Sequence, residues 1–262
     1  MSVVKKGTGL QVVVAHSGIL IPAEIDPDSL SDRFPALARN VDWYTDWLYD
    51  FRDLLDCRLS VFPYCSLILE ANRHPDRLED CVPLGDVHGE PVYKPGREPA
   101  PELRRALAAK YLLPFHCAVS EQIAAGGTFL LDGHSTVTAR GMADNGIDIM
   151  NFQHSPLDDG PRRFSPAPFA AAYAEELRRR LPEARVTVNA SEYFRVYGHV
   201  AAAHSCDARA RVGRRVPALV QETNERLYKN SDHTPDLRAI DRLRRAFALS
   251  LAAALERVGG GD

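Results

Sequence analysis

Three short segments of the chain share one pattern, in which a continuous run of apolar residues ends abruptly in polar ones. They are residues 10–18 (LQVVVAHSG), 66–75 (SLILEANRHP) and 126–136 (GGTFLLDGHST). A fourth segment, 216–228, begins in the same way and then becomes helix-like. Apolar runs of this length without alternation are typical of strands that are buried on both faces of a sheet. The pattern therefore predicts a buried, parallel or mixed sheet.

Helical patterns lie between these runs, at residues 41–55, 100–113, 166–181 and 236–258. Strands that alternate with helices predict an α/β fold with a mixed, largely parallel sheet covered by helices on both faces. At 262 residues, we expect one domain over 1–262. Residues 74–99 look irregular, and loops of that length often cover a functional site.

The composition limits the class of protein. A hydrophobic fraction of 45% and a charged fraction of 26% exclude disordered and fibrous classes, and a net charge of -3 gives no reason to expect a nucleic-acid partner. No apolar run approaches the roughly 18 residues of a membrane span, and no signal peptide precedes the first strand, so we expect a cytoplasmic protein without a membrane partner. The five cysteines contain no C-x-x-C pair, which argues against a disulfide framework and a zinc-thiolate site.

The polar residues that follow each apolar run are candidates for a site, because ligands of open α/β sheets bind at the carboxyl ends of strands. These candidates are His16 and Ser17, Glu70 with Asn72 and Arg73, Asp132 with His134, and Gln221 with Glu222. Two imidazoles and one carboxylate commonly hold zinc and leave a fourth position for a water molecule. A nearby Glu can take the proton of that water and pass it to a leaving nitrogen. A serine-hydrolase site is less well supported, since no G-x-S-x-G elbow occurs.

Each candidate also has a purely structural interpretation. Asp132 can orient His134, as carboxylates orient metal-bound imidazoles, or it can form a turn before Gly133. Arg73 can bind a substrate carboxylate in a bidentate fork or close a surface ion pair. Glu222 would have a raised pKa suited to a base if it is buried, and would start a helix if it is exposed.

Residues 41–51 (VDWYTDWLYDF) offer a third ligand. Asp42 and Asp46 are four residues apart and share one face of the predicted helix. They are either a solvated face or the source of a carboxylate for the metal. The opposite, apolar side is predicted to be core and consists of Trp43, Trp47, Leu48 and Phe51.

Six motifs follow one another between about residues 12 and 228: HSGILIP, VDWYTDWLYDF, LEANRHP, LPFHCAV, LLDGHST and ALVQETNERLY. In this order they resemble the motifs of the N-formylglutamate amidohydrolase family. The fold of that family is similar to the fold of zinc carboxypeptidases and aspartoacylase. The resemblance implies a metal-dependent enzyme that uses zinc or another divalent ion.

The resemblance also implies a role for each matched residue around the metal. His16 and His134 would be metal ligands, together with Asp42 as the expected carboxylate ligand. Asp46 is the second candidate for that ligand and otherwise a supporting residue. Asp132 would hold the ring of His134.

The catalytic and substrate-binding roles follow from the same motifs. Glu222 would be the general acid and base. Asn72 and Arg73 match an Asn-Arg pair that contacts the substrate carboxylate in aspartoacylase-like relatives, and Arg73 also counts as a catalytic cation. Glu70 stands where the family more often has Asp, in a supporting position.

Residues 188–205 match the family only in part, because a double glycine is absent. Within this segment, Arg195 and Tyr197 can be aligned and are expected to bind the substrate. Glycines allow a backbone to approach a ligand closely, so their loss predicts a reshaped pocket.

The resemblance therefore implies hydrolysis of the amide bond of N-formylglutamate or a related small N-acyl amino acid by a zinc-activated water. Two alternatives remain: a hydrolase of a larger peptide-like or modified amino-acid substrate, and a non-catalytic binding protein with the same fold. The enzyme is favoured because every proposed catalytic position holds a competent residue.

Overall fold

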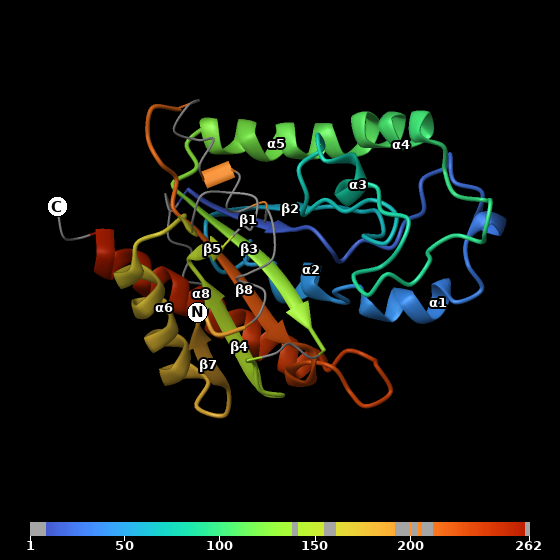
Figure 1. Ribbon diagram of the computed structural model, residues 1–262. Coiled ribbons are helices and arrows are strands. Elements are labelled where there is room, and N and C mark those ends of the chain that lie inside the picture. The colour runs from blue at the N-terminus through green and yellow to red at the C-terminus, as the bar shows by residue number, and fades with distance from the viewer. Residues whose placement is uncertain are drawn as a thin grey trace.

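The computed structural model describes residues 9–137, 141–154, 161–191, 200, 204–205 and 212–259. Within these ranges, six strands form one sheet in the order β2-β1-β3-β8-β4-β7 (Figure 1). Their bounds are β1 Leu10–Val14, β2 Cys57–Val61, β3 Phe129–Thr136, β4 Gly146–Met150, β7 Arg185–Val188 and β8 Ala218–Asn224. β2, β1, β3 and β8 are parallel, whereas β4 is antiparallel to β8 and parallel to β7. The predicted mixed, largely parallel sheet is therefore confirmed.

Helices cover both faces of this sheet, as predicted (Figure 1). α6 (Ala167–Arg180) and α8 (Leu237–Gly259) pack on one face and α5 (Leu113–Ala124) on the other. The side chains of β3 alternate between these two layers. Leu131 joins the core under α6 and α8, whereas Leu130 joins the core under α5.

The remaining elements are short. α1 spans Phe34–Leu37, α2 Thr45–Leu48, α3 Leu78–Cys81 and α4 Pro101–Leu107, and 3-10 turns cover Pro27–Ser29, Ala38–Asn40 and Glu225–Leu227. β5 (Phe152–His154) and β6 (Pro161–Arg163) form a separate antiparallel pair. Over the ranges that the structure describes, no helix combines the length and the apolar character needed to cross a membrane.

Two of the predicted helices are confirmed, and a third is longer than predicted. α6 and α8 match the segments at 166–181 and 236–258. The segment predicted at 100–113 continues to Ala124, because a π-helical turn at Ala108–Leu112 joins α4 to α5. Pro114 lies in the first turn of α5 and has no amide hydrogen to donate to the preceding turn. The irregular, π-helical junction accommodates this missing hydrogen bond.

The predicted helix over 41–55 is wrong, since only α2, a single turn, forms there. Tyr44 has a left-handed backbone conformation with φ of 66°, which prevents a regular helix from starting before it. Leu48 and Phe51 are fully buried, as predicted, but Trp47 is 47% exposed and does not belong to the core.

The predicted strand at 66–75 is also wrong. Ile68 and Leu69 are fully buried, but their amide groups both donate to the carbonyl oxygen of Cys65, so the chain turns here instead of extending. On the side of β1 away from β3, the neighbouring strand is β2, which precedes this segment and is only half-buried. Burial of an apolar run therefore did not distinguish a strand from a buried turn.

Candidate active site

Three side chains from distant parts of the chain meet at the carboxyl edge of the sheet. His16 lies just beyond β1, Asp42 lies before α2, and His134 lies in β3. The Nδ1 atom of His134 is 3.2 Å from Nδ1 of His16 and 3.3 Å from Oδ2 of Asp42. The distance from Nδ1 of His16 to the same carboxylate oxygen is 3.5 Å. The structure thus brings together the three residues that were predicted as metal ligands.

The opposite nitrogen of each imidazole is held by a second carboxylate. His16 Nε2 lies 2.6 Å from Glu70 Oε1, and His134 Nε2 lies 2.9 Å from Asp132 Oδ1. Because a carboxylate oxygen accepts hydrogen bonds, the hydrogen of each neutral ring is on Nε2. Nδ1 then carries a lone pair, which is directed toward Asp42. Metal-bound imidazoles are commonly oriented by a carboxylate in this way.

The donor atoms fit a divalent cation. Two imidazole nitrogens and one carboxylate oxygen, all directed at one point, are the ligand set that zinc commonly takes from proteins. Without a proton or a cation between them, these three electron-rich atoms would repel each other. His16, Asp42 and His134 could therefore hold a metal ion.

The electrostatics of this cluster also favour positive charge. Burial lowers the pKa of His16, but the negative charge of Glu70 and hydrogen bonds to Asp42 and Glu70 outweigh that effect and raise the pKa to about 9. Burial raises the pKa of Glu70, but the nearby His16 reverses this and lowers the pKa to about 2. The potential that stabilises a proton on the imidazoles would equally stabilise a metal cation.

The segment Asp132-Gly133-His134 owes its spacing to the strand. Side chains two residues apart in β3 point to the same face, so Asp132 and His134 can contact each other. A Cβ atom on Gly133 would lie 2.6 Å from the ring of Tyr49. The hydroxyl of Tyr49 in turn lies 3.0 Å from the carbonyl oxygen of His134 and fixes that strand end. Since all three residues are inside β3, the turn-forming interpretation of Asp132 is wrong.

Glu222 lies beside His134, because the two residues are register partners in the parallel β3–β8 pair. Glu222 is 4% exposed, and its Oε2 has no hydrogen-bond partner within the described ranges. Burial raises the pKa of Glu222 well above its ordinary value, although the positive charge of His134 opposes this. The 3-10 turn begins only at Glu225, so the helix-start interpretation of Glu222 is wrong.

Asn72 and Arg73 lie on the turn that replaces the predicted strand. Asn72 is buried, and its Oδ1 accepts a hydrogen bond of 2.8 Å from the amide of Val200. Arg73 is half-buried, and its Nη1 donates to the carbonyl oxygen of Asn72 at 3.0 Å. In the part of the chain that is described, no carboxylate forms an ion pair with Arg73, so the surface ion-pair interpretation gains no support.

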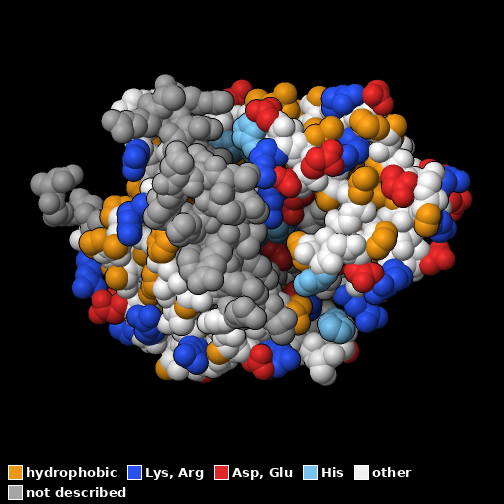
Figure 2. All heavy atoms as spheres, in the orientation of Figure 1, with side chains coloured by type: hydrophobic (Ala, Val, Ile, Leu, Met, Phe, Trp, Pro, Cys, Tyr) orange, Lys and Arg blue, Asp and Glu red, His pale blue; other side chains and the backbone are white. Residues whose placement is uncertain are grey.

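A cavity of about 600 Å³ connects these residues. His16, Asp42, His134, Glu222 and Arg73 all line it. Figure 2 shows acidic and basic side chains around a hollow on this face. The irregular segment 74–99, which was expected to cover a site, forms one wall of this cavity. Its lining residues, none of which was named as a site residue from the sequence, are Glu79, Asp80, Pro83, Gly85, Asp86, Val87 and His88.

One predicted residue that the structure describes, Asp46, is not in this constellation. Asp46 is half-buried and does not line the cavity. Burial raises the pKa of Asp46. Arg195 and Tyr197 lie outside the described residues.

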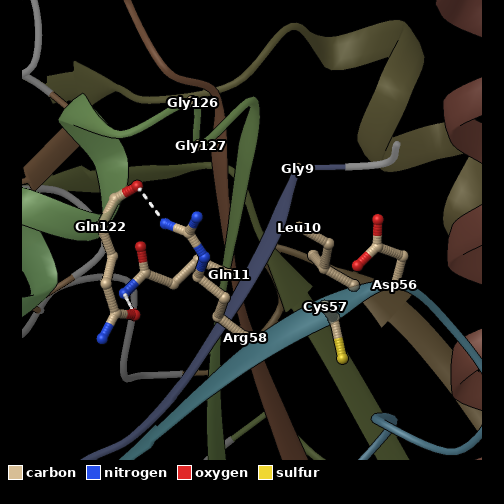
Figure 3. A pocket seen from close by; sticks show the side chains of 9 residues that line it. All are labelled: Gly9, Leu10, Gln11, Asp56, Cys57, Arg58, Gln122, Gly126 and Gly127. Carbon is tan, nitrogen blue, oxygen red and sulfur yellow. Dashed lines mark hydrogen bonds between the residues drawn. The ribbon is translucent and has the colours of Figure 1, made fainter. Parts of the chain in front are cut away.

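A second pocket of about 100 Å³ lies at the opposite edge of the sheet, at the start of β1 and β2 (Figure 3). Its polar side chains largely bind each other. Gln11 donates to the side chain of Gln122 at 2.8 Å, and Arg58 donates to the backbone carbonyl of Gln122 at 3.0 Å. Among the predicted site residues that the structure describes, none lines this pocket.

The sheet, with histidines and carboxylates gathered at the carboxyl edge of its central strands, defines an α/β enzyme. The sequence profile described as N-formylglutamate amidohydrolase matches residues 9–229. The chain therefore belongs to the N-formylglutamate amidohydrolase family, as its motifs predicted, and is an amidohydrolase.

Several solved structures are similar to this one. N-formylglutamate amidohydrolase from Ralstonia eutropha JMP134 shares 17% sequence identity with a TM-score of 0.71, and 98% of this chain and 96% of that chain are covered. A gene product from Agrobacterium tumefaciens shares 16% identity with a TM-score of 0.62, over 97% of this chain and 92% of that chain. No curated protein sequence matches the chain. At these identities the two structures confirm the fold.

Proposed function

We propose that this amidohydrolase depends on zinc or another divalent ion and cleaves the amide bond of N-formylglutamate or a related small N-acyl amino acid. The observation that carries the proposal is the convergence of His16 Nδ1, His134 Nδ1 and Asp42 Oδ2 within 3.5 Å of one another. These three residues would hold the ion. When bound, such an ion lowers the pKa of a water molecule and polarises a carbonyl group.

Glu222 is proposed as the general acid and base. Its buried carboxyl group has a raised pKa, and its Oε2 is not occupied by a described hydrogen-bond donor. A carboxylate with a raised pKa is a stronger base, and it can hold the proton of the attacking water until it passes that proton to the leaving nitrogen. The proton would move through Oε2 of Glu222 in both steps.

Arg73 is proposed to bind the α-carboxylate of the substrate. A guanidinium matches a carboxylate in a bidentate fork, and Arg73 lines the cavity as a cation without a described ion-pair partner. The same charge would stabilise negative charge that develops on the acyl oxygen. Asn72, Arg195 and Tyr197 are proposed as further substrate contacts, and Asp132 is proposed to hold the His134 ring.

A larger substrate is the second candidate. The cavity of about 600 Å³ lies within the range of roughly 300–1,000 Å³ that holds drug-sized ligands. Such a volume can accept a peptide-like or modified amino acid in place of N-formylglutamate.

Elemental mass spectrometry of the purified protein, followed by hydrolysis assays, tests the proposal. We expect about one zinc per chain and release of formate from N-formylglutamate or of another acyl group from a related substrate. The Glu222→Gln variant should keep the metal and lose turnover by a factor on the order of 10²–10⁴. Full turnover by this variant would remove Glu222 from the reaction.

The same assays separate the alternatives. Turnover of peptides without turnover of N-acyl amino acids would favour the larger substrate. Failure to bind any divalent ion, even when zinc is supplied, would contradict the metal-dependent enzyme and favour a binding protein.

A further inference from the structure

A chain of buried side chains lies directly behind Arg73 and has no part in the proposed chemistry. His116 Nε2, on α5, is 3.1 Å from the carbonyl oxygen of Arg73. His116 Nδ1 is 3.1 Å from His204 Nε2, and His204 Nδ1 is 3.0 Å from Ser120 Oγ. The two imidazole rings are nearly parallel, with centroids 5.4 Å apart, which is the separation of two rings joined edge to edge by this contact. His116, His204 and Ser120 are all buried, so this relay is shielded from solvent.

The hydrogen bonds of the relay have a defined direction. A carbonyl oxygen only accepts, so His116 Nε2 carries a hydrogen and donates it to Arg73. Burial, reinforced by the nearby His74, lowers the pKa of His116 to about 4, which keeps the ring neutral near pH 7. Nδ1 of a neutral His116 accepts, and His204 Nε2 must therefore donate to it. In a neutral His204, Nδ1 then accepts from the hydroxyl of Ser120.

The segment that carries Arg73 needs such a partner. Residues 70–73 belong to no strand or helix, so their peptide groups find no regular ladder, and buried peptide groups require hydrogen bonds from elsewhere. Glu70 Oε1 accepts from the amide of Asn72 at 2.8 Å, and Arg73 Nη1 donates to the Asn72 carbonyl at 3.0 Å. His116 supplies a hydrogen bond that connects this segment to α5.

We propose that His116, supported by His204 and Ser120, is a positioning residue that holds Arg73 in place for the substrate carboxylate. This inference rests on the proposed function, because it assumes that Arg73 binds the substrate. Loss of the hydrogen bond would leave the carbonyl of Arg73 without its donor and release the turn from α5. A small displacement of a binding group is enough to weaken substrate binding strongly.

Two substitutions of His116 distinguish the hydrogen bond from mere packing. His116→Leu removes the donor, and we expect KM to rise about tenfold to a hundredfold with a smaller change in kcat and an unchanged metal content. His116→Gln provides an amide N–H in place of Nε2–H and should restore most of the lost affinity. Equal defects in both variants, or a wild-type KM in His116→Leu, would overturn the proposal.

Ser120→Ala tests the far end of the relay without altering a histidine. We expect a smaller rise in KM, of about twofold to tenfold, because the donor to His204 is lost but both rings remain. Ser250→Ala is the matched control, since Ser250 is also a buried serine on a helix, and its Oγ has no partner within the described residues. The control should leave KM unchanged. An unchanged KM in Ser120→Ala would remove Ser120 from the relay.

Nitrogen-15 NMR of the histidines provides a readout that requires no turnover. The resonances of His116 are identified by their loss in the His116→Gln spectrum, and we expect the Nε2–H form of a neutral ring at pH 7. An Nδ1–H form or a charged ring would contradict the proposal, even if His116→Leu fails to fold. If the wild-type protein hydrolyses no N-acyl amino acid, the proposed function fails, and the tautomer alone then decides whether His116 holds the Arg73 carbonyl.

Discussion

In each imidazole of the candidate metal centre, the two ring nitrogens contact different carboxylates. On His16 and His134, Nε2 contacts a carboxylate and Nδ1 faces Asp42. Asp42 also accepts a hydrogen bond of 3.1 Å from the amide of Ser135, which fixes its carboxylate next to β3. Asp46 has none of these contacts among the described ones, although the sequence offers it as a ligand at a similar position. The geometry thus separates two carboxylates that sequence spacing could not.

This difference predicts the metal affinity of two matched variants. Asp42→Asn should weaken zinc binding by at least about a hundredfold, because a neutral amide replaces a charged ligand at the point where both imidazoles converge. Asp46→Asn removes the same charge four residues away and should bind zinc like the wild type. Competition with a chromogenic chelator measures both affinities. Weaker binding by Asp46→Asn alone would make Asp46 the ligand.

Gly133 leads to a second prediction for a single residue. Its added Cβ would come within 2.6 Å of the Tyr49 ring, so Gly133→Ala has to displace either the ring or the strand. Overpacking of this kind costs about 1–3 kcal/mol in the free energy of unfolding. Urea denaturation measures the loss. Wild-type stability would show that Tyr49 can move without cost.

The sequence predicted the contact between the two site residues of β3, but it did not predict the contacts that join residues from different segments. Asp132 and His134 share one face because strand side chains repeat every two residues, which a sequence reveals directly. The contact of His16 with Glu70 joins residues 54 positions apart, and no local pattern contains it. His116 lies in one of the family motifs, but no role could be assigned to it because its partner is a backbone carbonyl.

At the level of elements, the long and regular ones were predictable. α6 and α8 have an apolar side that packs on the sheet, and β1, β3 and β8 have uninterrupted apolar runs. The segments that place Asp42, Asn72 and Arg73 are short turns whose conformation depends on contacts with the rest of the protein. β4 and β7 were missed because their short runs include Asp148 and Arg185.

Helix α8 contains a buried hydroxyl group that forms no hydrogen bond with the described residues. Ser250 is fully buried, and its Oγ lacks a hydrogen-bond partner in the described part of the protein. Ser250→Ala removes this desolvated hydroxyl and adds a residue of higher helix propensity, so we expect a gain of about 0.5–1 kcal/mol in the free energy of unfolding. Thermal denaturation monitored by circular dichroism should show a higher Tm. A lower Tm would reveal that the hydroxyl has a partner.

At the scale of the whole molecule, the sheet concentrates charged side chains at one edge, although the net charge of the protein is small. A net charge of -3 is small, but Asp42, Glu70, Asp132 and Glu222 all surround two imidazoles at one edge of the sheet. The parallel strands β1, β3 and β8 end side by side there. Charged residues from three distant segments are therefore close enough to act on one another electrostatically. The net charge argued only against a nucleic-acid partner. The order of the strands, which the net charge does not reveal, is what brings the site residues together.

The pH dependence of stability should reveal the buried His116. An unfolded histidine has a pKa near 6.5, and burial lowers the pKa of His116 to about 4 in the folded protein. Between these values the unfolded chain binds a proton that the folded protein does not, so the contribution of His116 is fully present above pH 6.5 and is lost as the pH falls toward 4. A shift of this size corresponds to roughly 3 kcal/mol.

His116→Gln isolates this contribution, because glutamine does not titrate. His74, Asp132 and His204 surround the ring and stay the same in both proteins. We expect the wild type to lose up to roughly 3 kcal/mol relative to this variant between pH 7 and pH 4, measured by urea denaturation at each pH. His88→Gln is the control, since His88 is exposed and its replacement should change the pH dependence much less. Parallel stability curves for the wild type and His116→Gln would mean that folding leaves the pKa of His116 unchanged, and this would contradict a ring that burial keeps neutral in the folded protein.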